Sequence, residues 1–205
     1  KIAFTIDEEI GTGASHFDVE KFAADFAYTM DGSALGGMEY ETCNAASASV
    51  KFQGVSVHPG SAKNTMVNAL VLAHEYFDAL PKFERPEHTE DYEGLYMLMD
   101  LNGNAEACEM SFIIRDHSRS RFEARKDYLE QIAAIMNEKY EHEYVNVNIN
   151  DSYYNMREVI EKNMEIVDLA EKAMNELGIE AKIAPVRGGT DGSRLSFDGL
   201  PTPNL

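Results

Sequence analysis

The sequence predicts an α/β domain that is interrupted by an inserted α+β module. Both ends of the chain contain short, continuous apolar runs typical of buried parallel strands, whereas apolar and polar residues alternate in the middle. The middle segment, residues 38–150, contains six expected elements in the order strand, helix, strand, strand, helix, strand. This order is that of the ferredoxin-like fold, an antiparallel sheet with two helices on one face.

The expected boundaries divide the chain into three parts. Residues 1–37 and 151–205 would form the α/β domain, and residues 38–150 would form the inserted module. Insertion at a surface turn is a tolerated route to two-domain enzymes, and it places a cleft between the domains.

Two apolar runs in the first part are expected to be buried strands, and each ends in acidic residues. Ile2–Ile6 is followed by three consecutive acids, and Phe26–Met30 is followed by Asp31. Between the runs, Asp18 is placed to cap a short helix that contains Phe22. Neighbouring parallel strands have their carboxyl ends at one edge of the sheet, where α/β enzymes place their active sites.

The acidic run contains the adjacent glutamates Glu8 and Glu9. In a hydrolytic metal site, one such glutamate would bind a cation and the other would take a proton from the attacking water. The same run also fits a solvated turn, and Asp31 followed by Gly32 also fits a plain turn.

The six expected elements of the module are inferred from the periodicity of apolar residues. The strands alternate apolar with polar residues, and the helices have apolar residues at spacings of three and four positions. Asn102-Gly103-Asn104 indicates a hairpin between the middle strands. Pro81 would end the first helix. The apolar positions are Ala46, Ala48, Val50 and Phe52; Met66, Ala69, Leu70, Ala73, Phe77 and Leu80; Cys108, Met110, Phe112 and Ile114; Phe122, Leu129, Ile132, Ala133 and Met136; and Val145, Val147 and Ile149.

The last part returns to α/β character. A helical stripe from Met164 to Leu177 precedes an expected strand, Ala181–Val186, which leads into the glycine-rich turn 187–192 and a short helix. A strand, a glycine-rich turn and a helix start together form a site that favours anions. Arg187 at the edge of this site is suited to bind a carboxylate through its guanidinium group. The glycine spacing matches neither a dinucleotide nor a Walker signature.

Composition narrows the class of protein. A formal net charge of -18 over 205 residues repels phosphate backbones and argues against nucleic-acid binding. Cys43 and Cys108 have no CxxC spacing, which argues against a disulfide framework or a thiolate zinc site and favours a reducing cytoplasm. The sequence contains no apolar run long enough for a membrane span and no signal-peptide pattern. We therefore expect a soluble, cytoplasmic protein. We also expect the chain to be a piece of a longer protein, because it starts at Lys1 and ends without a closing element.

Several motifs, in this order, resemble the peptidase T group of tripeptide aminopeptidases, in the two-zinc metallopeptidase family that also includes carnosinase-like dipeptidases. The resemblance covers essentially the whole chain, and the sixth motif is the one that favours the tripeptidases. The motifs are Thr5-Ile6-Asp7-Glu8-Glu9-Ile10-Gly11, Tyr28-Thr29-Met30-Asp31-Gly32, Asn44-Ala45-Ala46-Ser47, His58-Pro59-Gly60, Ile114-Arg115-Asp116, Asp151-Ser152-Tyr153-Tyr154-Asn155-Met156-Arg157 and Arg187-Gly188-Gly189-Thr190-Asp191-Gly192.

This resemblance implies roles for three acids in the α/β domain. Glu8 would be the general base that deprotonates the metal-bridging water, and Glu9 would ligate one zinc ion. Asp31 matches the acid that holds the other zinc ion. Two cations at this spacing, about 3.5–4 Å, polarise a peptide carbonyl and hold a hydroxide between them.

The resemblance also assigns the inserted module to the family's lid, a partial cover over the α/β catalytic domain. His58 would reach the substrate carbonyl and stabilise the oxyanion. Arg187 would pair with the C-terminal carboxylate of a short peptide, and Arg115, which would point away from the helices, is a further candidate for substrate binding. An ordinary loop position also accounts for His58. The other histidines are expected on polar loops or helix faces, with no functional role: His16, His74, His88, His117 and His142.

The family also needs a His-x-Asp motif, an aspartate that bridges the metals and a late histidine. This sequence has no His-x-Asp that matches the family's motif and no matching bridging aspartate, and it stops before the late histidine would appear. The resemblance therefore implies that the full-length parent hydrolyses the N-terminal peptide bond of tripeptides with two zinc ions, and that this chain alone is inactive. The alternatives are a related dipeptidase or aminoacylase, or a chain in which residues 38–150 act as a dimerisation or binding module through exposed sheet edges.

Overall fold

In a computed structural model, residues 1–8, 12–32 and 34–205 are described. The chain divides into two compact units. Unit 1 comprises residues 1–44, 117–119 and 153–205, and unit 2 comprises residues 45–116 and 120–152. No helix in the described part of the chain is both long and apolar enough to cross a membrane.

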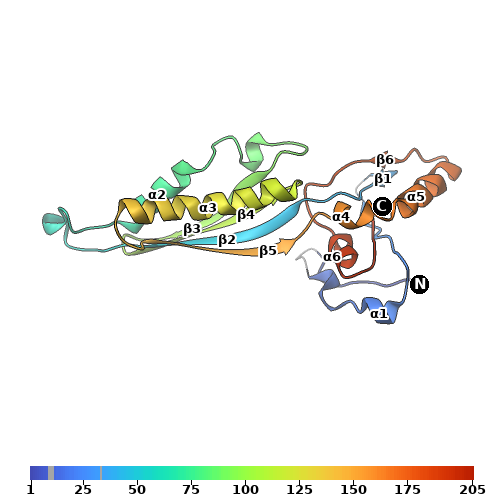
Figure 1. The fold of residues 1–205 in the computed structure, drawn as a ribbon, viewed down its shortest axis with the longest axis horizontal. Coiled ribbons are helices and arrows are strands. Elements are labelled where there is room, and N and C mark those ends of the chain that lie inside the picture. The colour runs from blue at the N-terminus through green and yellow to red at the C-terminus, as the bar shows by residue number, and fades with distance from the viewer. Residues whose placement is uncertain (9–11, 33) are drawn as a thin grey trace. The chain divides into compact units, whose positions relative to one another are not determined.

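Unit 2 is built on a four-stranded sheet with the strand order β3-β4-β2-β5. Helices α2 and α3 lie on the same face of this sheet (Figure 1). The chain order and the strand order together are those of the ferredoxin-like fold, so that prediction is confirmed. The elements are β2 (Asn44–Gln53), η3 (Pro59–Ser61), α2 (Ala69–Ala79), η4 (Pro86–His88), β3 (Leu95–Gly103), β4 (Ala107–Asp116), α3 (Arg119–Lys139) and β5 (Val145–Tyr153).

The predicted hairpin joins β3 to β4. The two strands pair antiparallel, with Gly103 opposite Cys108. The side chain of Asn104 closes the turn by accepting hydrogen bonds from the amides of Glu106 (2.8 Å) and Ala107 (3.2 Å). The turn chemistry therefore follows from the residues that indicated it.

The buried face of the sheet agrees with the predicted alternation. Every predicted apolar position of β2, β4 and α3 is buried, and the pattern along β4 alternates throughout. Helix α2 differs, because its buried residues are Ala69, Leu72, Ala73 and Tyr76, whereas the predicted Leu70 is 43% exposed. The helix buries a tyrosine because the Tyr76 hydroxyl donates to the Leu129 carbonyl at 2.8 Å, which satisfies it inside the core.

Unit 1 contains a small core that joins its first and last segments. Strands β1 and β6 pair parallel, and β6 is shorter than the predicted strand Ala181–Val186. The core contains Met38, Met156 and residues of α5, and predicted Leu177 lies outside it, 77% exposed, after the helix ends. The elements are η2 (Gly13–His16), α1 (Val19–Phe22), β1 (Gly37–Met38), α4 (Arg157–Ile160), α5 (Met164–Glu176), β6 (Lys182–Ile183) and α6 (Asp191–Phe197).

The first segment of unit 1 differs from the prediction. Helix α1 is confirmed, with the Asp18 carboxylate accepting from the Lys21 amide at 2.9 Å. The two strands are wrong: Ile2–Ile6 is not a strand, Phe4 is 95% exposed, and Phe26–Met30 contributes only an isolated bridge from Thr29. A strand needs a paired neighbour and a covering layer, and the described residues supply Ile2–Ile6 with no paired strand.

The buried tyrosines of unit 2 predict how stability changes at alkaline pH. Tyr96 donates to the Arg125 carbonyl at 3.1 Å, and burial raises its pKa to about 12 from 10.0. Burial raises the pKa of Tyr76 as well. The unfolded chain loses these protons first, so stability is complete below pH 10 and is lost as the pH rises toward 12.

We expect Tyr96→Phe to reduce the slope of unfolding free energy against pH above pH 10 by at most about 1.4 kcal/mol per pH unit. The measurement is urea denaturation of the chain at several alkaline pH values. Tyr92→Phe is the control, because Tyr92 is 45% exposed. An unchanged slope in Tyr96→Phe would contradict the prediction.

Candidate active site

A cavity of about 750 Å³ in unit 1 brings together acids that are far apart in the sequence. Glu8 and Asp31 both line this cavity, and so do Thr190 and Asp191 at the start of α6. The structure therefore places two of the predicted site residues around one space. Their catalytic and metal-binding roles stay predictions.

The predicted metal ligand Glu9 lies outside the described residues. Among the residues that the structure does describe, no three His, Cys, Asp or Glu side chains form a group that could hold a metal ion. Carboxylate oxygens are suitable zinc ligands, so Asp31 fits such a site in chemical type. The described acids nevertheless make up only part of a ligand set.

Asp191, which the sequence did not single out by itself, holds the segment around Glu8. Its Oδ2 accepts from the Thr5 hydroxyl at 2.8 Å and its Oδ1 accepts from the Ala14 amide at 3.0 Å. A Cβ atom on Gly13 would lie 2.5 Å from Asp191 Oδ2, so this approach requires glycine. Thr5 and Ala14 lie on either side of Glu8 in the sequence, so one half-buried carboxylate is bonded to a residue before Glu8 and to a residue after it.

Asp31 is held by the last residues of the chain. Its amide donates to the Leu205 carbonyl at 3.1 Å, and the Gly32 amide donates to the same carbonyl at 2.8 Å. The Leu205 amide in turn donates to the Thr29 carbonyl at 2.9 Å. These backbone bonds fix where the Asp31 carboxylate enters the cavity.

His58 lies in unit 2 and is exposed. It caps η3, because its Nδ1 accepts from the Gly60 amide at 3.1 Å. A ring nitrogen that accepts a hydrogen bond is unprotonated, so the neutral imidazole has its proton on Nε2. The cap thus leaves Nε2–H as a donor, which is the group an oxyanion needs.

The two candidate arginines belong to different units. Arg115 lies in unit 2 on β4, where it alternates with fully buried Ile114 and so faces away from the helices, as predicted. Arg187 lies in unit 1 and is half-buried, between Val186 and Gly188. Their roles in substrate binding stay predictions.

His117 corrects the expectation that it lies on a polar loop or helix face. It is only 6% exposed, and its Nε2 lies 3.2 Å from the Val186 carbonyl, beside Arg187. Its neighbours Asp116 and Ser118 give the local sequence a polar appearance. The hydrogen-bond partner of His117 lies 69 residues away in the sequence. Periodicity reports only on residues that are near in the sequence, so it could not reveal this buried position.

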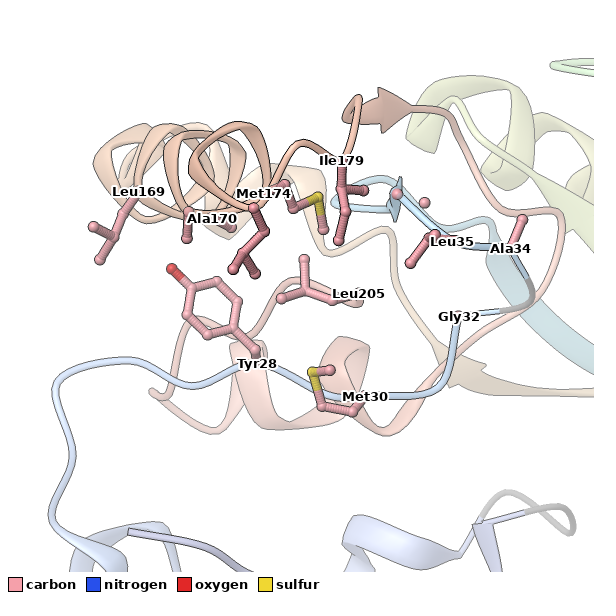
Figure 2. A pocket seen from close by; sticks show the side chains of 14 residues that line it. Tyr28, Met30, Gly32, Ala34, Leu35, Leu169, Ala170, Met174, Ile179 and Leu205 are labelled. Atoms are coloured by element: carbon pink, nitrogen blue, oxygen red, sulfur yellow. The ribbon is translucent and has the colours of Figure 1, made fainter.

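A second cavity in unit 1, of about 540 Å³, is apolar (Figure 2). It lies between α5 and the segment from Tyr28 to Gly37, and Leu205 lines it as well. The Tyr28 hydroxyl donates to the Ile166 carbonyl at 2.6 Å, and burial raises the pKa of Tyr28. Tyr28 is the one polar side chain among the described lining residues, so this cavity offers no acid–base chemistry near neutral pH.

Comparison with known proteins shows which family the chain belongs to. Residues 40–143, which are more than half of the chain, match the family model of the M20 peptidase dimerisation domain. The chain belongs to the M20 peptidase family.

Curated M20 relatives named peptidase T match over all 205 residues of the chain. Peptidase T of Caldanaerobacter subterraneus subsp. tengcongensis is 55% identical and that of Bacillus mycoides is 57% identical. Each match covers 100% of this chain and 50% of the relative. The chain therefore spans about half the length of the curated relatives it matches.

Solved structures support the fold. A tripeptidase from Staphylococcus aureus superposes with a TM-score of 0.83 at 23% identity, covering 98% of this chain and 54% of that one. Aminopeptidase PepT from Bacillus cereus superposes with a TM-score of 0.79 at 19% identity, covering 98% and 54%. A Bacillus subtilis protein, described as a dinuclear metal-binding peptidase of the M20 family, gives 0.66 at 12% identity, covering 98% and 53%.

We expect Asp191→Ala to free the segment around Glu8. Removing the carboxylate leaves the Ala14 amide and the Thr5 hydroxyl without this acceptor, so amide exchange at Ala14 should become roughly tenfold faster. Hydrogen exchange followed by NMR measures this. Asp198→Ala is the control, because that carboxylate lies at the other end of α6 and is 49% exposed. Unchanged exchange at Ala14 would show that Asp191 does not hold the segment.

Proposed function

We propose that this chain is part of a zinc-dependent aminotripeptidase, which hydrolyses the N-terminal peptide bond of tripeptides, and that the 205 residues alone are inactive. The observation on which the proposal rests is that Glu8 and Asp31 line one cavity of unit 1. Support also comes from the peptidase T relatives, which match the whole chain at 55–57% identity.

In this proposal the acids around the cavity divide the work. Glu8 accepts the proton of the attacking water, and Asp31 and Glu9 hold zinc as part of a ligand set that the longer protein completes. Two zinc ions, when bound, polarise the scissile carbonyl and lower the pKa of the water. Asp191 keeps the loop of Glu8 against α6, so the base does not have to be ordered again in each reaction cycle.

The remaining candidates bind the substrate. The Nε2–H group of His58 donates to the oxyanion that forms on the peptide carbonyl. Arg187 pairs with the C-terminal carboxylate, for which the planar guanidinium offers two parallel donors. Arg115 provides a second cationic contact to the peptide.

A related dipeptidase or aminoacylase is the competing enzyme class. The fold does not choose between them, because solved structures with the same fold at 11–23% identity include a tripeptidase and a hydantoinase/carbamoylase-family amidase. The close relatives are named peptidase T, the group of tripeptide aminopeptidases that the sequence motifs resemble, and this favours the tripeptidase. Profiling the longer protein on dipeptides, tripeptides and acyl amino acids separates the classes.

We further propose that the protein works in the cytoplasm on short peptides. Two buried thiols, Cys43 and Cys108, are compatible with a reducing compartment. A net charge of -18 disfavours nucleic acid as a partner, and we propose no membrane attachment.

We expect Glu8→Gln in the longer protein to lower kcat for a tripeptide by about 10²- to 10⁴-fold, because the amide cannot accept the proton of water. Glu20→Gln is the control, since Glu20 is an exposed glutamate on α1. An unchanged kcat in Glu8→Gln would refute the assignment. The 205-residue chain with added Zn²⁺ should give no turnover, and turnover that Glu8→Gln abolishes would refute its inactivity.

We also propose that the protein forms a homodimer through unit 2. The matching family model describes a dimerisation domain, and β3 is an edge strand of the described sheet with exposed apolar side chains. Unpaired edge strands add readily to a second sheet. The exposed residues are Met97 (40%), Met99 (52%) and Leu101 (49%).

We expect light scattering on the chain to show a mass that rises toward a dimer with concentration. Met99→Lys should weaken association by roughly tenfold, because it places a charge beside the edge strand. Ile135→Lys is the matched control, since Ile135 is 65% exposed but lies on α3. A monomer at all concentrations, or equal effects of both variants, would contradict the proposal.

A further inference from the structure

Arg187 lies in a short segment of unit 1 that is tied to buried residues on both sides. Before it, the Val186 amide donates to the Glu41 carbonyl at 2.9 Å, and the Val186 carbonyl lies 3.2 Å from His117 Nε2. After it, the Gly188 carbonyl accepts from the Cys43 amide at 3.2 Å. The backbone that presents Arg187 is therefore fixed one residue away in each direction.

The state of the His117 ring follows from its partner. A carbonyl oxygen only accepts hydrogen bonds, so the His117 Nε2 must be protonated and donates to Val186. Cys43 Sγ lies 3.7 Å from both ring nitrogens. An equal distance to both places the sulfur over the face of the ring, because an approach in the ring plane would bring it too close to Cε1. Cys43 thus sets the plane of the ring whose edge holds Val186.

His117 is itself held by two buried amides. Its carbonyl accepts from Asn44 Nδ2 at 3.1 Å and from Asn155 Nδ2 at 3.1 Å. Asn44 is fully buried, Asn155 is nearly so, and His117 is 6% exposed. The backbone of His117 therefore cannot move without breaking buried hydrogen bonds. A side chain that positions another residue needs such a fixed backbone.

We infer that His117 is a positioning residue for Arg187: its Nε2–H group, oriented by Cys43, fixes the backbone from which the guanidinium reaches the C-terminal carboxylate of the peptide. The inference rests on the proposed function, in which Arg187 binds that carboxylate. Arginine has a long, flexible side chain, so the place and direction of its backbone decide whether both donors reach one carboxylate. His117 does not contact the substrate.

A purely structural role for His117 makes a different prediction. Damage to the core of unit 1 would impair every substrate, whereas misplacing Arg187 impairs only substrates that have a C-terminal carboxylate. A tripeptide and the corresponding tripeptide amide differ in this group alone. The ratio of their KM values therefore separates the two roles.

The experiment uses the longer protein with tripeptide and tripeptide amide. We expect His117→Leu to raise KM for the tripeptide about tenfold, with kcat and the KM of the amide changed by less than about twofold. His117→Gln should restore the wild-type ratio, because glutamine supplies an N–H donor. His74→Leu is the control, since the side chain of His74 is 79% exposed in unit 2. Equal losses on both substrates, or no loss, would overturn the inference.

Arg187→Ala distinguishes failure of the inference from failure of the proposed function. If Arg187→Ala leaves the preference for a carboxylate intact, the role proposed for Arg187 is wrong, and the inference falls with it. If Arg187→Ala abolishes the preference while His117→Leu keeps it, only the inference is wrong.

A second measurement needs no variant and no activity. Long-range ¹⁵N–¹H NMR on the 205-residue chain reports which ring nitrogen of His117 is protonated. We expect a signal from protonated Nε2 that persists in the folded chain. A ring protonated only on Nδ1 would show that the bond to Val186 does not exist, and would overturn the inference even if His117→Leu did not fold.

Discussion

A network of buried amides holds together the segments through which the chain passes from unit 1 to unit 2 and back. Asn44 ends the first segment of unit 1, and its Oδ1 accepts from the Asn155 amide at 3.0 Å. Asn155 Oδ1 in turn accepts from the Thr42 amide at 3.0 Å. Both side-chain amides also donate to the His117 carbonyl, at 3.1 Å each. Leaving one of these groups unsatisfied would cost about 1–3 kcal/mol.

This network explains why the site residues of unit 1 lie where they do. The residues on either side of Arg187 are hydrogen-bonded to Cys43 and His117, which belong to the network or lie next to it. Ser193 of α6 also reaches the network, since its hydroxyl lies 3.2 Å from the Thr42 hydroxyl. Helix α6 begins at Asp191, whose carboxylate holds the segment of Glu8. The acid at the cavity and the arginine therefore depend on the same buried hydrogen bonds.

The sequence predicted the module well, because each of its elements has one buried face and thus a clear period. The buried face of helix α2 is rotated from the predicted one, because Tyr76 is buried with its hydroxyl bonded to the Leu129 carbonyl. The runs 2–6 and 26–30 have strand composition, but composition does not supply a neighbouring strand. Asp191 and His117 could not be assigned, because their partners lie 177 and 69 residues away and show no periodicity.

Because unit 1 is formed by separate stretches of the sequence, its parts leave the ribosome at different times. Residues 45–152 contain the whole of unit 2, together with residues 117–119 of unit 1, so unit 2 can fold as it leaves the ribosome. Residues 1–44 must wait for residues 153–205, which at a synthesis rate of about 5–20 residues per second takes roughly 10 to 30 s. During that interval the side chains of Ile2, Phe4 and Ile6 are available to chaperones, and residues 1–44 are open to proteolysis because their partners are not yet made.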